Sequence, residues 1–507
     1  MKFERQSGIV LHPTSLPGPY GIGEIGTEAF AFVDALAEMG QRLWQVLPLG
    51  PTSYGDSPYQ CLSSFAGNHL LISFEALIDQ GLLQREELAG YPSFSPGSVD
   101  FGAVIPAREG VLAVVANRFQ ERAGDRMKDE FAAFRETNAD WLADYALFVA
   151  LKRAHGGRPW MEWAPELVRR DPQALDQARR EHAAIVAEVE VQQFLFSQQW
   201  QALEAYCHDK GIQLIGDIPI FVAHDSADVW AEPEWFHLTE EGHCTVVAGV
   251  PPDYFSATGQ RWGNPLYRWD RMAENDFAWW KRRLRTLFEL VDIVRIDHFR
   301  GFEAYWEIPA SEETAVNGKW ISGPGCALFE AFEKEFDRLP IIAEDLGIIT
   351  EAVDQLRDKC GFPGMRVLQF IVGNDQNEPG YWPDQFPEES VCYTGTHDND
   401  TTLGWYLSGK SDGQPKSPEE VAEEQHKIRT FLECDGSQVH WDMLALSLGT
   451  KSSVVIAPLQ DLLGLTSEAR LNQPGRAEGN WRWRFEWDQL TVDVKQRMKA
   501  LTAEHGR

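Results

Sequence analysis

The sequence lacks any run of apolar residues long enough to cross a membrane, for which roughly eighteen would be needed. Its first ten residues, MKFERQSGIV, also lack the apolar segment of a secretory signal peptide. Both absences argue against a membrane protein and against export. We therefore expect a cytoplasmic protein with no membrane partner.

Basic residues are few relative to acidic ones. Lys and Arg together number 46 and Asp and Glu 77, which gives a formal net charge of −31 at pH 7. A surface with that charge repels the phosphate backbone of DNA and RNA. We therefore expect no nucleic-acid partner.

Cysteine is also scarce and shows no pattern. The seven cysteines lie singly along the chain, without a CxxC pair or a regular interval. This argues against a disulfide framework and predicts reduced, mostly buried thiols. Tryptophan, in contrast, is abundant, with 19 residues. Its flat ring suits ligands such as sugars, but composition alone favours the simpler interpretation that these rings fill a large core.

Eight segments have the apolar composition of buried strands and are separated mostly by helical patterns. They are Gly8–His12, Arg42–Leu49, Gln213–Phe221, the apolar start of Asp292–Phe302, Ile341–Leu346, Val367–Val372, Ser390–Thr396 and Ser453–Leu459. Alternating strands and helices predict βαβ units, and eight such units make a TIM barrel. The predicted fold is an α/β protein, a (β/α)8 TIM barrel with large, mainly helical insertions between its strands.

A chain of 507 residues exceeds what one hydrophobic core usually holds, so a single catalytic domain over residues 1–507 must carry insertions. The largest, residues 75–210 after the second strand, is predicted to be helical. Residues 222–290 follow the third strand and contain GVPPDYFSATGQRWGNP, a turn-rich segment whose aromatic clusters favour a function. A smaller insertion, residues 303–338, follows the fourth strand.

Three carboxylate motifs stand where predicted strands end. They are RIDHF around Asp297, AEDLG around Glu344 and THDND around Asp398. One carboxylate after a strand is ordinarily the cap of the next helix. In a TIM barrel, however, the carboxyl ends of all strands face one active site, so these three side chains would converge. The set favours an active site over three separate caps.

Converging carboxylates suit glycoside chemistry. One attacks the anomeric carbon, and a second with a raised pKa protonates the leaving oxygen. A third can hydrogen-bond ring hydroxyls and stabilise the oxocarbenium-like transition state. Arg295 lies two residues before Asp297, on the same face of the strand, and is expected to keep that carboxylate ionised.

Metal binding is the competing chemistry, since Asp297 with His298 and His397 with Asp398 form two His-Asp pairs. Adjacent residues on a strand point to opposite faces, so each pair would have to bind a metal from a bend. The sequence contains no HxH or HExxH motif. We therefore predict no metal and no cofactor.

Long motifs of the sequence resemble those of one family. They include HPTSLPGPYGIG, WQVLPLGPTSYGDSPYQ, GDIPIFVAHDSADVW, VRIDHFRGFEAYWEIPA, YTGTHDNDTTLGW and EARLNQPGRAEGNWRWR. Over nearly its whole length the chain is similar to the bacterial 4-α-glucanotransferases, or amylomaltases, of glycoside hydrolase family 77. The resemblance implies retaining transfer of α-1,4-glucan segments from maltooligosaccharides, amylose or glycogen to the 4-hydroxyl of glucose or a glucan, including cyclisation to cycloamylose. We expect a monomer or weak homo-oligomer.

The resemblance also implies residue roles. Asp297 would be the nucleophile, Glu344 the general acid/base and Asp398 the transition-state stabiliser. Sugar contacts near the nucleophile would come from Tyr59, Asp217, Arg295, His298, His397 and Asn472. Residues 249–262 resemble a mobile lid, whose contributions would be Asp253, Tyr254, Phe255, Gln260 and Trp262. Tyr54 resembles an aromatic residue of a second glucan site, where Phe101 replaces a Tyr common in relatives and is expected to keep the stacking but not the hydroxyl contact.

Two other functions are compatible with these motifs. A retaining glucan hydrolase of the α-amylase type would use the same three carboxylates on the same barrel. A non-catalytic glucan-binding protein would need the aromatic residues but would have little reason to keep all three carboxylates.

Overall fold

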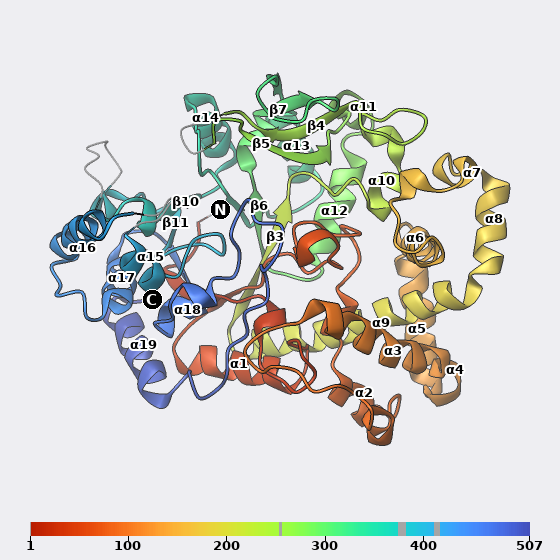
Figure 1. Cartoon of the computed structure of the whole chain (residues 1–507), viewed down its shortest axis with the longest axis horizontal. Coiled ribbons are helices and arrows are strands. Elements are labelled where there is room, and N and C mark those ends of the chain that lie inside the picture. The colour runs from red at the N-terminus through yellow and green to blue at the C-terminus, as the bar shows by residue number, and fades with distance from the viewer. Residues whose placement is uncertain (1, 253–255, 374–381, 410–415) are drawn as a thin grey trace.

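The computed structural model describes residues 2–252, 256–373, 382–409 and 416–507 (Figure 1). Within them, eight parallel strands form one sheet in the order β10-β11-β12-β1-β2-β3-β6-β9. Their bounds are β1 Gln6–Val10, β2 Leu43–Gln45, β3 Gln213–Pro219, β6 Ile293–Asp297, β9 Ile341–Ala343, β10 Gly364–Val367, β11 Ser390–Tyr393 and β12 Val454–Pro458. The backbone N–H of Ala343 donates to the carbonyl of Pro363 at 3.0 Å, which brings the two edge strands together. The predicted barrel is confirmed.

The barrel interior is filled by strand side chains. Tyr393 of β11 donates a hydrogen bond to Gln45 of β2 at 3.0 Å, although these strands are not neighbours in the sheet. Apolar residues from several strands form a cluster of their own: Leu43, Ile215, Ile293, Ile342, Met365, Val391 and Val454. The barrel is therefore a packed core rather than a channel.

Several strands end earlier than the sequence predicted, and the sixth is displaced. Val367–Val372 was predicted as a strand, but the strand is β10, and Leu368–Phe370 forms a 3₁₀ helix. The prediction is wrong because Leu368 and Val372 are fully buried in this turn, so their apolar character reflects core packing rather than a strand. Similarly, β2 ends at Gln45 because the chain turns at Leu47, whose φ is 62°.

Helices surround the barrel, and most of those between β2 and β3 lie to one side of it (Figure 1). These are α2 Phe74–Asp79, α3 Phe101–Asn117, α4 Phe119–Arg122, α5 Asp125–Thr137, α6 Leu142–Ala154, α7 Pro165–Val168, α8 Pro172–Glu181 and α9 Ala183–Asp209. The remaining helices are α1 Thr27–Glu38, α10 Ala227–Ala231, α11 Trp269–Glu274, α12 Ala278–Phe288, α13 Cys326–Glu333, α14 Glu351–Cys360, α15 Thr402–Ser408, α16 Pro418–Leu432, α17 Val439–Gly449, α18 Leu459–Leu462 and α19 Val492–Glu504. The amide of Gln193 in α9 bonds both backbone groups of Gly67 at 2.8 and 2.9 Å, which ties this long helix to the loop after β2.

A second, antiparallel sheet was not predicted. Its strands are β4 Val246–Val250, β5 Gln260–Pro265, β7 Ala304–Pro309 and β8 Lys319–Ser322, in the order β5-β4-β7-β8. It joins the segment after β3 to the segment after β6 and lies at the top of Figure 1. The segment 249–262, predicted as a loop, therefore begins in β4 and ends in β5.

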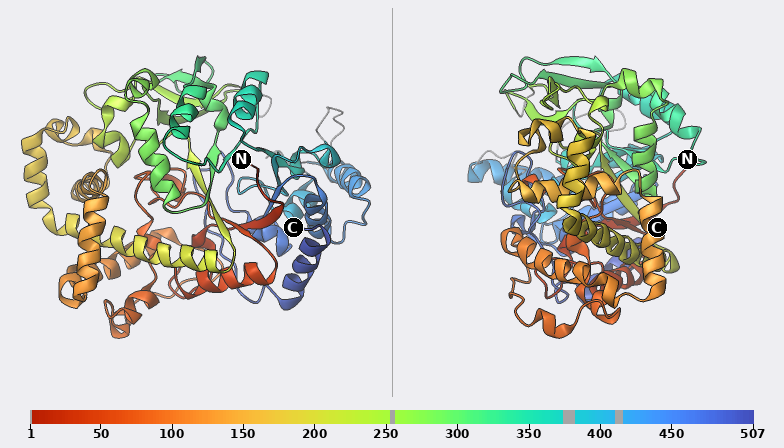
Figure 2. Two further views of the ribbon diagram at one scale, coloured as in Figure 1. Left: turned by 180° about the vertical axis from the view of Figure 1, so that it is seen from behind. Right: turned by 90° about the vertical axis from the view of Figure 1, so that its right-hand side faces the viewer.

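The two ends of the chain lie close together, as the views of Figure 2 show. The first and last barrel strands, β1 and β12, are paired from Gln6 with Val454 to Val10 with Pro458.

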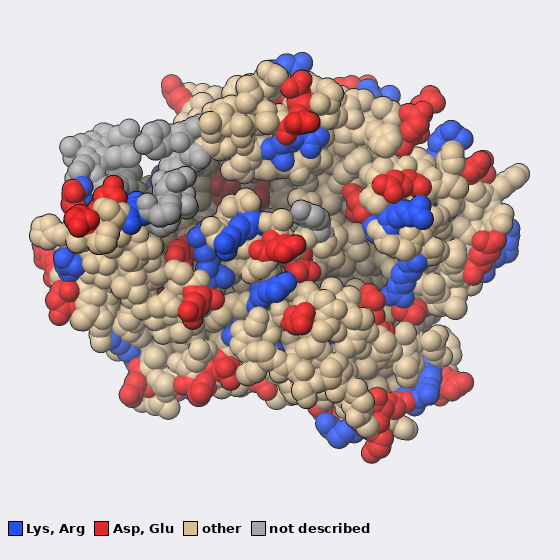
Figure 3. All heavy atoms as spheres, in the orientation of Figure 1, with Lys and Arg blue, Asp and Glu red and all other residues tan. Residues whose placement is uncertain are grey.

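The surface seen in Figure 3 is hollowed near its centre and carries interspersed acidic and basic side chains. In the part of the chain that the structure describes, no helix has both the length and the apolar character needed to cross a bilayer. All seven cysteines are free thiols, but only Cys207 and Cys392 are buried, so the expectation that most are buried is wrong.

Candidate active site

Asp297 and Glu344 stand side by side at the carboxyl ends of neighbouring strands. Ile296 of β6 pairs with Ala343 of β9, so the residues that follow each of them occupy adjacent positions. The backbone N–H of Glu344 donates to the carbonyl of Ile296 at 3.0 Å. The convergence predicted for these two carboxylates is therefore present.

Glu344 is buried and held by two backbone groups. Its Oε2 accepts from the N–H of His298 at 2.7 Å and its Oε1 from the N–H of Leu346 at 2.9 Å. Burial raises the pKa of the carboxyl to about 8, and the negative charge of Asp297 adds to this effect. Arg295 and the two N–H groups act in the opposite direction but are outweighed. Glu344 is thus mainly protonated at neutral pH, as a general acid requires.

Arg295 joins two carboxylates. Its Nη1 lies 3.0 Å from Oδ1 of Asp297 and 2.6 Å from Oδ2 of Asp217. The predicted contact between Arg295 and Asp297 is confirmed. The same oxygen of Asp217 accepts from the hydroxyl of Tyr59 at 2.9 Å. Asp217 is fully buried, and burial raises its pKa to about 7 in spite of the neighbouring guanidinium.

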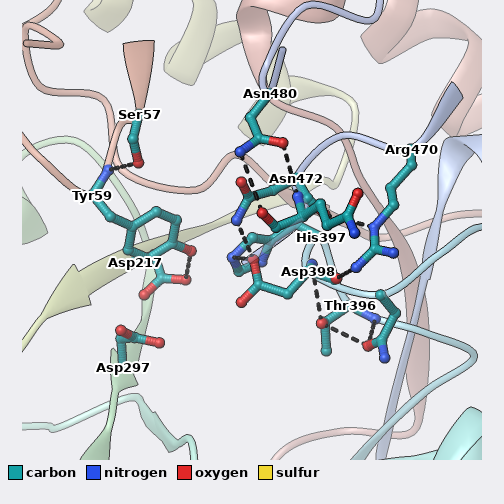
Figure 4. A network of polar contacts seen from close by, with 12 residues as sticks. Ser57, Tyr59, Asp217, Asp297, Thr396, His397, Asp398, Arg470, Asn472 and Asn480 are labelled. Carbon is teal, nitrogen blue, oxygen red and sulfur yellow. Dashed lines mark hydrogen bonds and ion pairs between the residues drawn. The ribbon is translucent and has the colours of Figure 1, made fainter. Parts of the chain in front are cut away.

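Asp398 lies in the loop after β11 and is held by a different part of the chain. Its Oδ1 accepts from Nδ2 of Asn472 at 2.6 Å and lies 3.2 Å from Nε2 of His397. The guanidinium of Arg470 donates to the backbone carbonyl of Asp398 at 2.5 Å. Figure 4 shows His397, Asp398 and Asn472 on one side of the site and Tyr59, Asp217 and Asp297 on the other.

Aromatic stacking connects the two sides. The ring of Tyr59 stacks on His397 with centroids 5.0 Å apart and planes 12° apart. Trp481 packs against both rings at 5.9 and 5.8 Å. Trp481 and Arg470 were not singled out from the sequence, although they lie in EARLNQPGRAEGNWRWR. Their contacts with Tyr59, His397 and Asp398 join this motif to distant segments. Sequence spacing gives no sign of such contacts.

His298 adopts a left-handed backbone conformation, with φ 53° and ψ 50°, directly after β6. Its ring meets that of Trp262 edge-on, with centroids 4.9 Å apart. Burial lowers the pKa of His298 to about 4, so the imidazole is neutral and can both donate and accept hydrogen bonds. Trp262, expected near the glucan, is therefore placed beside the site by β5, and its Nε1 donates to the exposed Gln260 at 3.0 Å.

The remaining predicted positions have different outcomes. Asp253, Tyr254 and Phe255 lie outside the described residues. Tyr54 begins a 3₁₀ helix, Tyr54–Asp56, in the loop after β2. Phe101 has only 3% of its surface exposed and packs in the core, so the expected stacking of this ring on a glucan is wrong.

Among the described residues, no group of three or more His, Cys, Asp or Glu side chains is placed to hold a metal ion. His298 and His397 have other surroundings. The first faces Trp262, and the second stacks on Tyr59 beside Asp398.

The chain is similar to known proteins over its whole length. A family model described as 4-alpha-glucanotransferase matches residues 11–491. The 4-alpha-glucanotransferase of Thermus thermophilus is 50% identical, with 99% of each chain covered, and the chloroplastic/amyloplastic one of Solanum tuberosum is 39% identical, with 99% of this chain and 86% of that protein covered. Among solved structures, the amylomaltase from Streptococcus agalactiae in complex with acarbose has a TM-score of 0.94 at 37% identity, covering 99% of this chain and 100% of that chain.

Proposed function

The chain belongs to the 4-alpha-glucanotransferase family, glycoside hydrolase family 77, and we propose that it moves α-1,4-glucan segments from a donor chain to the 4-hydroxyl of an acceptor sugar. One observation carries the proposal most directly. A carboxyl group whose pKa is raised to about 8, Glu344, stands beside a carboxylate paired with a guanidinium, Asp297. Acid and nucleophile in this arrangement suit a retaining double displacement.

In the first half-reaction, a carboxylate oxygen of Asp297 attacks the anomeric carbon of the donor sugar. The glycosidic bond breaks, and its oxygen takes the proton of Glu344 and leaves as the 4-hydroxyl of the released fragment. The products are a glycosyl ester on Asp297 and an ionised Glu344. The guanidinium of Arg295 at 3.0 Å from Asp297 favours the ionised carboxylate that must attack.

In the second half-reaction, Glu344 takes the proton of an acceptor 4-hydroxyl, and that oxygen attacks the anomeric carbon. The new glycosidic bond forms with the original configuration, Asp297 leaves as a carboxylate, and Glu344 is protonated again. When the acceptor is the far end of the same donor chain, the product is cyclic. When it is water, the outcome is hydrolysis.

Asp398 is proposed to accept hydrogen bonds from hydroxyls of the sugar at the cleavage point. These hydrogen bonds strengthen as positive charge develops on the ring. Asn472 at 2.6 Å leaves the second oxygen of this carboxylate available for substrate. Tyr59, Asp217, His298 and His397 surround the same position and are proposed to contact the sugar.

Transfer requires that water be kept from the glycosyl ester until an acceptor arrives. We assign this role to the segment 249–262, because its Trp262 packs on His298, the residue next to the nucleophile. Shortening the loop between β4 and β5 should raise the fraction of hydrolysis. A truncated variant that still generated no new reducing ends from maltotriose would exclude this role.

The decisive experiment is the product ladder from maltotriose, with total reducing ends measured in parallel. A transferase produces glucose and longer oligosaccharides while reducing ends stay constant. Steadily rising reducing ends would instead indicate the α-amylase type of hydrolase.

Two substitutions, one at the end of strand β6 and one just before its start, test the site. Asp297→Asn should bind maltooligosaccharides but lose transfer activity by several orders of magnitude, about 10⁴-fold or more. Asp292→Asn is the matched control, because Asp292 precedes the same strand at the opposite end of the barrel and bonds Leu214 and His208. Full transfer by Asp297→Asn would rule out the assigned nucleophile, and a binding protein would show no turnover in any variant.

A further inference from the structure

Asp461 lies in α18, directly after β12, and has 1% of its surface exposed. Its Oδ2 accepts hydrogen bonds from the hydroxyls of Thr394 at 2.6 Å and Thr402 at 2.7 Å. Its Oδ1 accepts from the backbone N–H of Thr402 at 2.6 Å. One buried carboxylate thus receives three short hydrogen bonds from two residues that are distant from it in sequence.

The two threonines bracket the loop that carries His397 and Asp398. Thr394 directly follows β11, and Thr402 is the first residue of α15. Asp461 therefore fixes where the loop leaves the strand and where it enters the helix. Residues 395–401, which include His397 and Asp398, connect these two fixed residues.

The segment that follows Asp461 holds the exposed side of the same loop. Ser467 donates to Oδ2 of Asp400 at 2.6 Å, and Arg470 and Asn472 bond the backbone and side chain of Asp398. Residues of the segment 461–472 therefore hydrogen-bond this loop on its buried side and on its exposed side. Asp461 supplies the inner contact, and the other three supply the outer ones.

A carboxylate at this place is costly. The three groups that donate to Asp461 are neutral, and burial raises its pKa because the charged form loses hydration. An apolar side chain of similar size would avoid this desolvation cost. What an apolar side chain cannot give is simultaneous hydrogen bonding to both ends of the loop, and this points to geometry as the contribution of Asp461.

We propose that Asp461 is a positioning residue of the glucan-transfer site, acting through Asp398 and His397 rather than on the substrate. The inference rests on the proposed function, because it matters only if Asp398 stabilises the transition state. Positioning within a fraction of an ångström is what such a carboxylate needs, since a displacement of about 1 Å can cost about 100-fold in rate.

The first test compares two substitutions of Asp461. Asp461→Asn keeps the oxygen that accepts from Thr402 N–H, and its amide can donate to the two hydroxyls, so kcat for maltotriose should stay within about threefold of the wild type. Asp461→Leu fills the space without any hydrogen bond, and its kcat should fall about 100-fold with little change in KM. Equal kcat losses for both substitutions, or none for either, would overturn the proposal.

A matched control separates positioning from general destabilisation. Asp292→Leu also removes a carboxylate that bridges a backbone N–H and a distant side chain, but at the other end of the barrel. Measured at equal folded fraction, its kcat should remain within about threefold of the wild type. A loss as large as that of Asp461→Leu would mean that the effect is not specific to this loop.

A double-mutant cycle tests the route through Asp398. If Asp461 acts through that carboxylate, Asp461→Leu should have little further effect in an Asp398→Asn background, so that the two losses are strongly non-additive. Additive losses would overturn the inference while leaving the proposed function intact. An Asp398→Asn variant with full activity would instead overturn the role of Asp398 in the proposed function, which keeps the two failures distinguishable.

Discussion

Glu344 accepts a hydrogen bond at 2.7 Å from the backbone N–H of His298, the residue that follows Asp297. The proposed general acid is therefore anchored to the strand end that carries the proposed nucleophile. Such an N–H favours the ionised carboxylate, but burial and the charge of Asp297 outweigh it and raise the pKa to about 8. The backbone fixes the position of the group, while its surroundings keep it protonated.

This pKa predicts the basic limb of the pH profile. The first half-reaction needs protonated Glu344, and that form is lost as pH rises through the pKa of the folded protein. We expect kcat/KM for maltotriose to be level below about pH 8 on this limb and then to fall about tenfold per pH unit. Initial rates of glucose release between pH 6 and pH 10 measure it. A basic limb centred below pH 6 would show that burial does not govern this carboxyl.

Arg295 should affect both the rate and that limb. Arg295→Gln leaves Asp217 and Asp297 without their shared cation, and we expect a loss of about 10²–10³ in kcat. The positive charge of Arg295 also lowers the pKa of Glu344, so its removal should move the basic limb to higher pH. Arg295→Lys keeps the charge and serves as the control. Identical limbs in the two variants would contradict this electrostatic coupling.

The barrel was predictable because each buried strand is a short local signal, and the order of such signals along the chain encodes the fold. The sixth strand shows the limit: the segment Val367–Val372 is largely apolar, as a buried strand would be, and nothing local reveals that Leu368–Phe370 forms a 3₁₀ helix instead. The antiparallel sheet was missed because β4 pairs with residues of β7 that lie about sixty positions later, and no sequence periodicity indicates such a pairing.

The residues of the site also fall into those that the sequence predicted and those that it did not. Asp297, Glu344 and Asp398 were predicted because each stands in a motif at the end of its own strand. Arg470, Trp481 and Asp461 contribute through contacts with residues more than fifty positions away, from Arg470 with Asp398 to Trp481 with Tyr59. Tertiary packing decides which polar residues make these contacts. A single sequence contains no direct information on that packing.

Asn472 offers a test of how Asp398 is held. Asn472→Ala removes the donor at 2.6 Å and frees the carboxylate to rotate, so kcat should fall about 10-fold. Asn472→Asp changes the size of the side chain very little but places a second carboxylate against the first, and its kcat should fall further. Both are assayed for glucose release from maltotriose at pH 7. If Asn472→Asp were the more active of the two, charge would not be the reason for an amide at this position.

Stability should depend on two arginines from opposite ends of the chain. The guanidinium of Arg507 donates to the carbonyls of Leu448, Thr450 and Ser452, around the end of α17, and also to those of Gln6 and Ser453. Arg5 shares the first three acceptors. Helix carbonyls lack partners at such an end, and a cation there also offsets the helix dipole.

We expect Arg507→Ala to lower the free energy of unfolding by about 2–3 kcal/mol, measured from urea unfolding curves, with little change in kcat. The control is Arg126→Ala, because Arg126 is exposed and its one ion pair among the described residues is with Glu130, one turn away. This substitution should change the free energy of unfolding by less than about 0.5 kcal/mol. Because Arg5 and Arg507 share acceptors, the carbonyls of Leu448, Thr450 and Ser452 keep a hydrogen-bond donor when only one of the two arginines is removed. The double variant should therefore lose more stability than the two single variants together, and simple additivity would show that the shared carbonyls do not couple them.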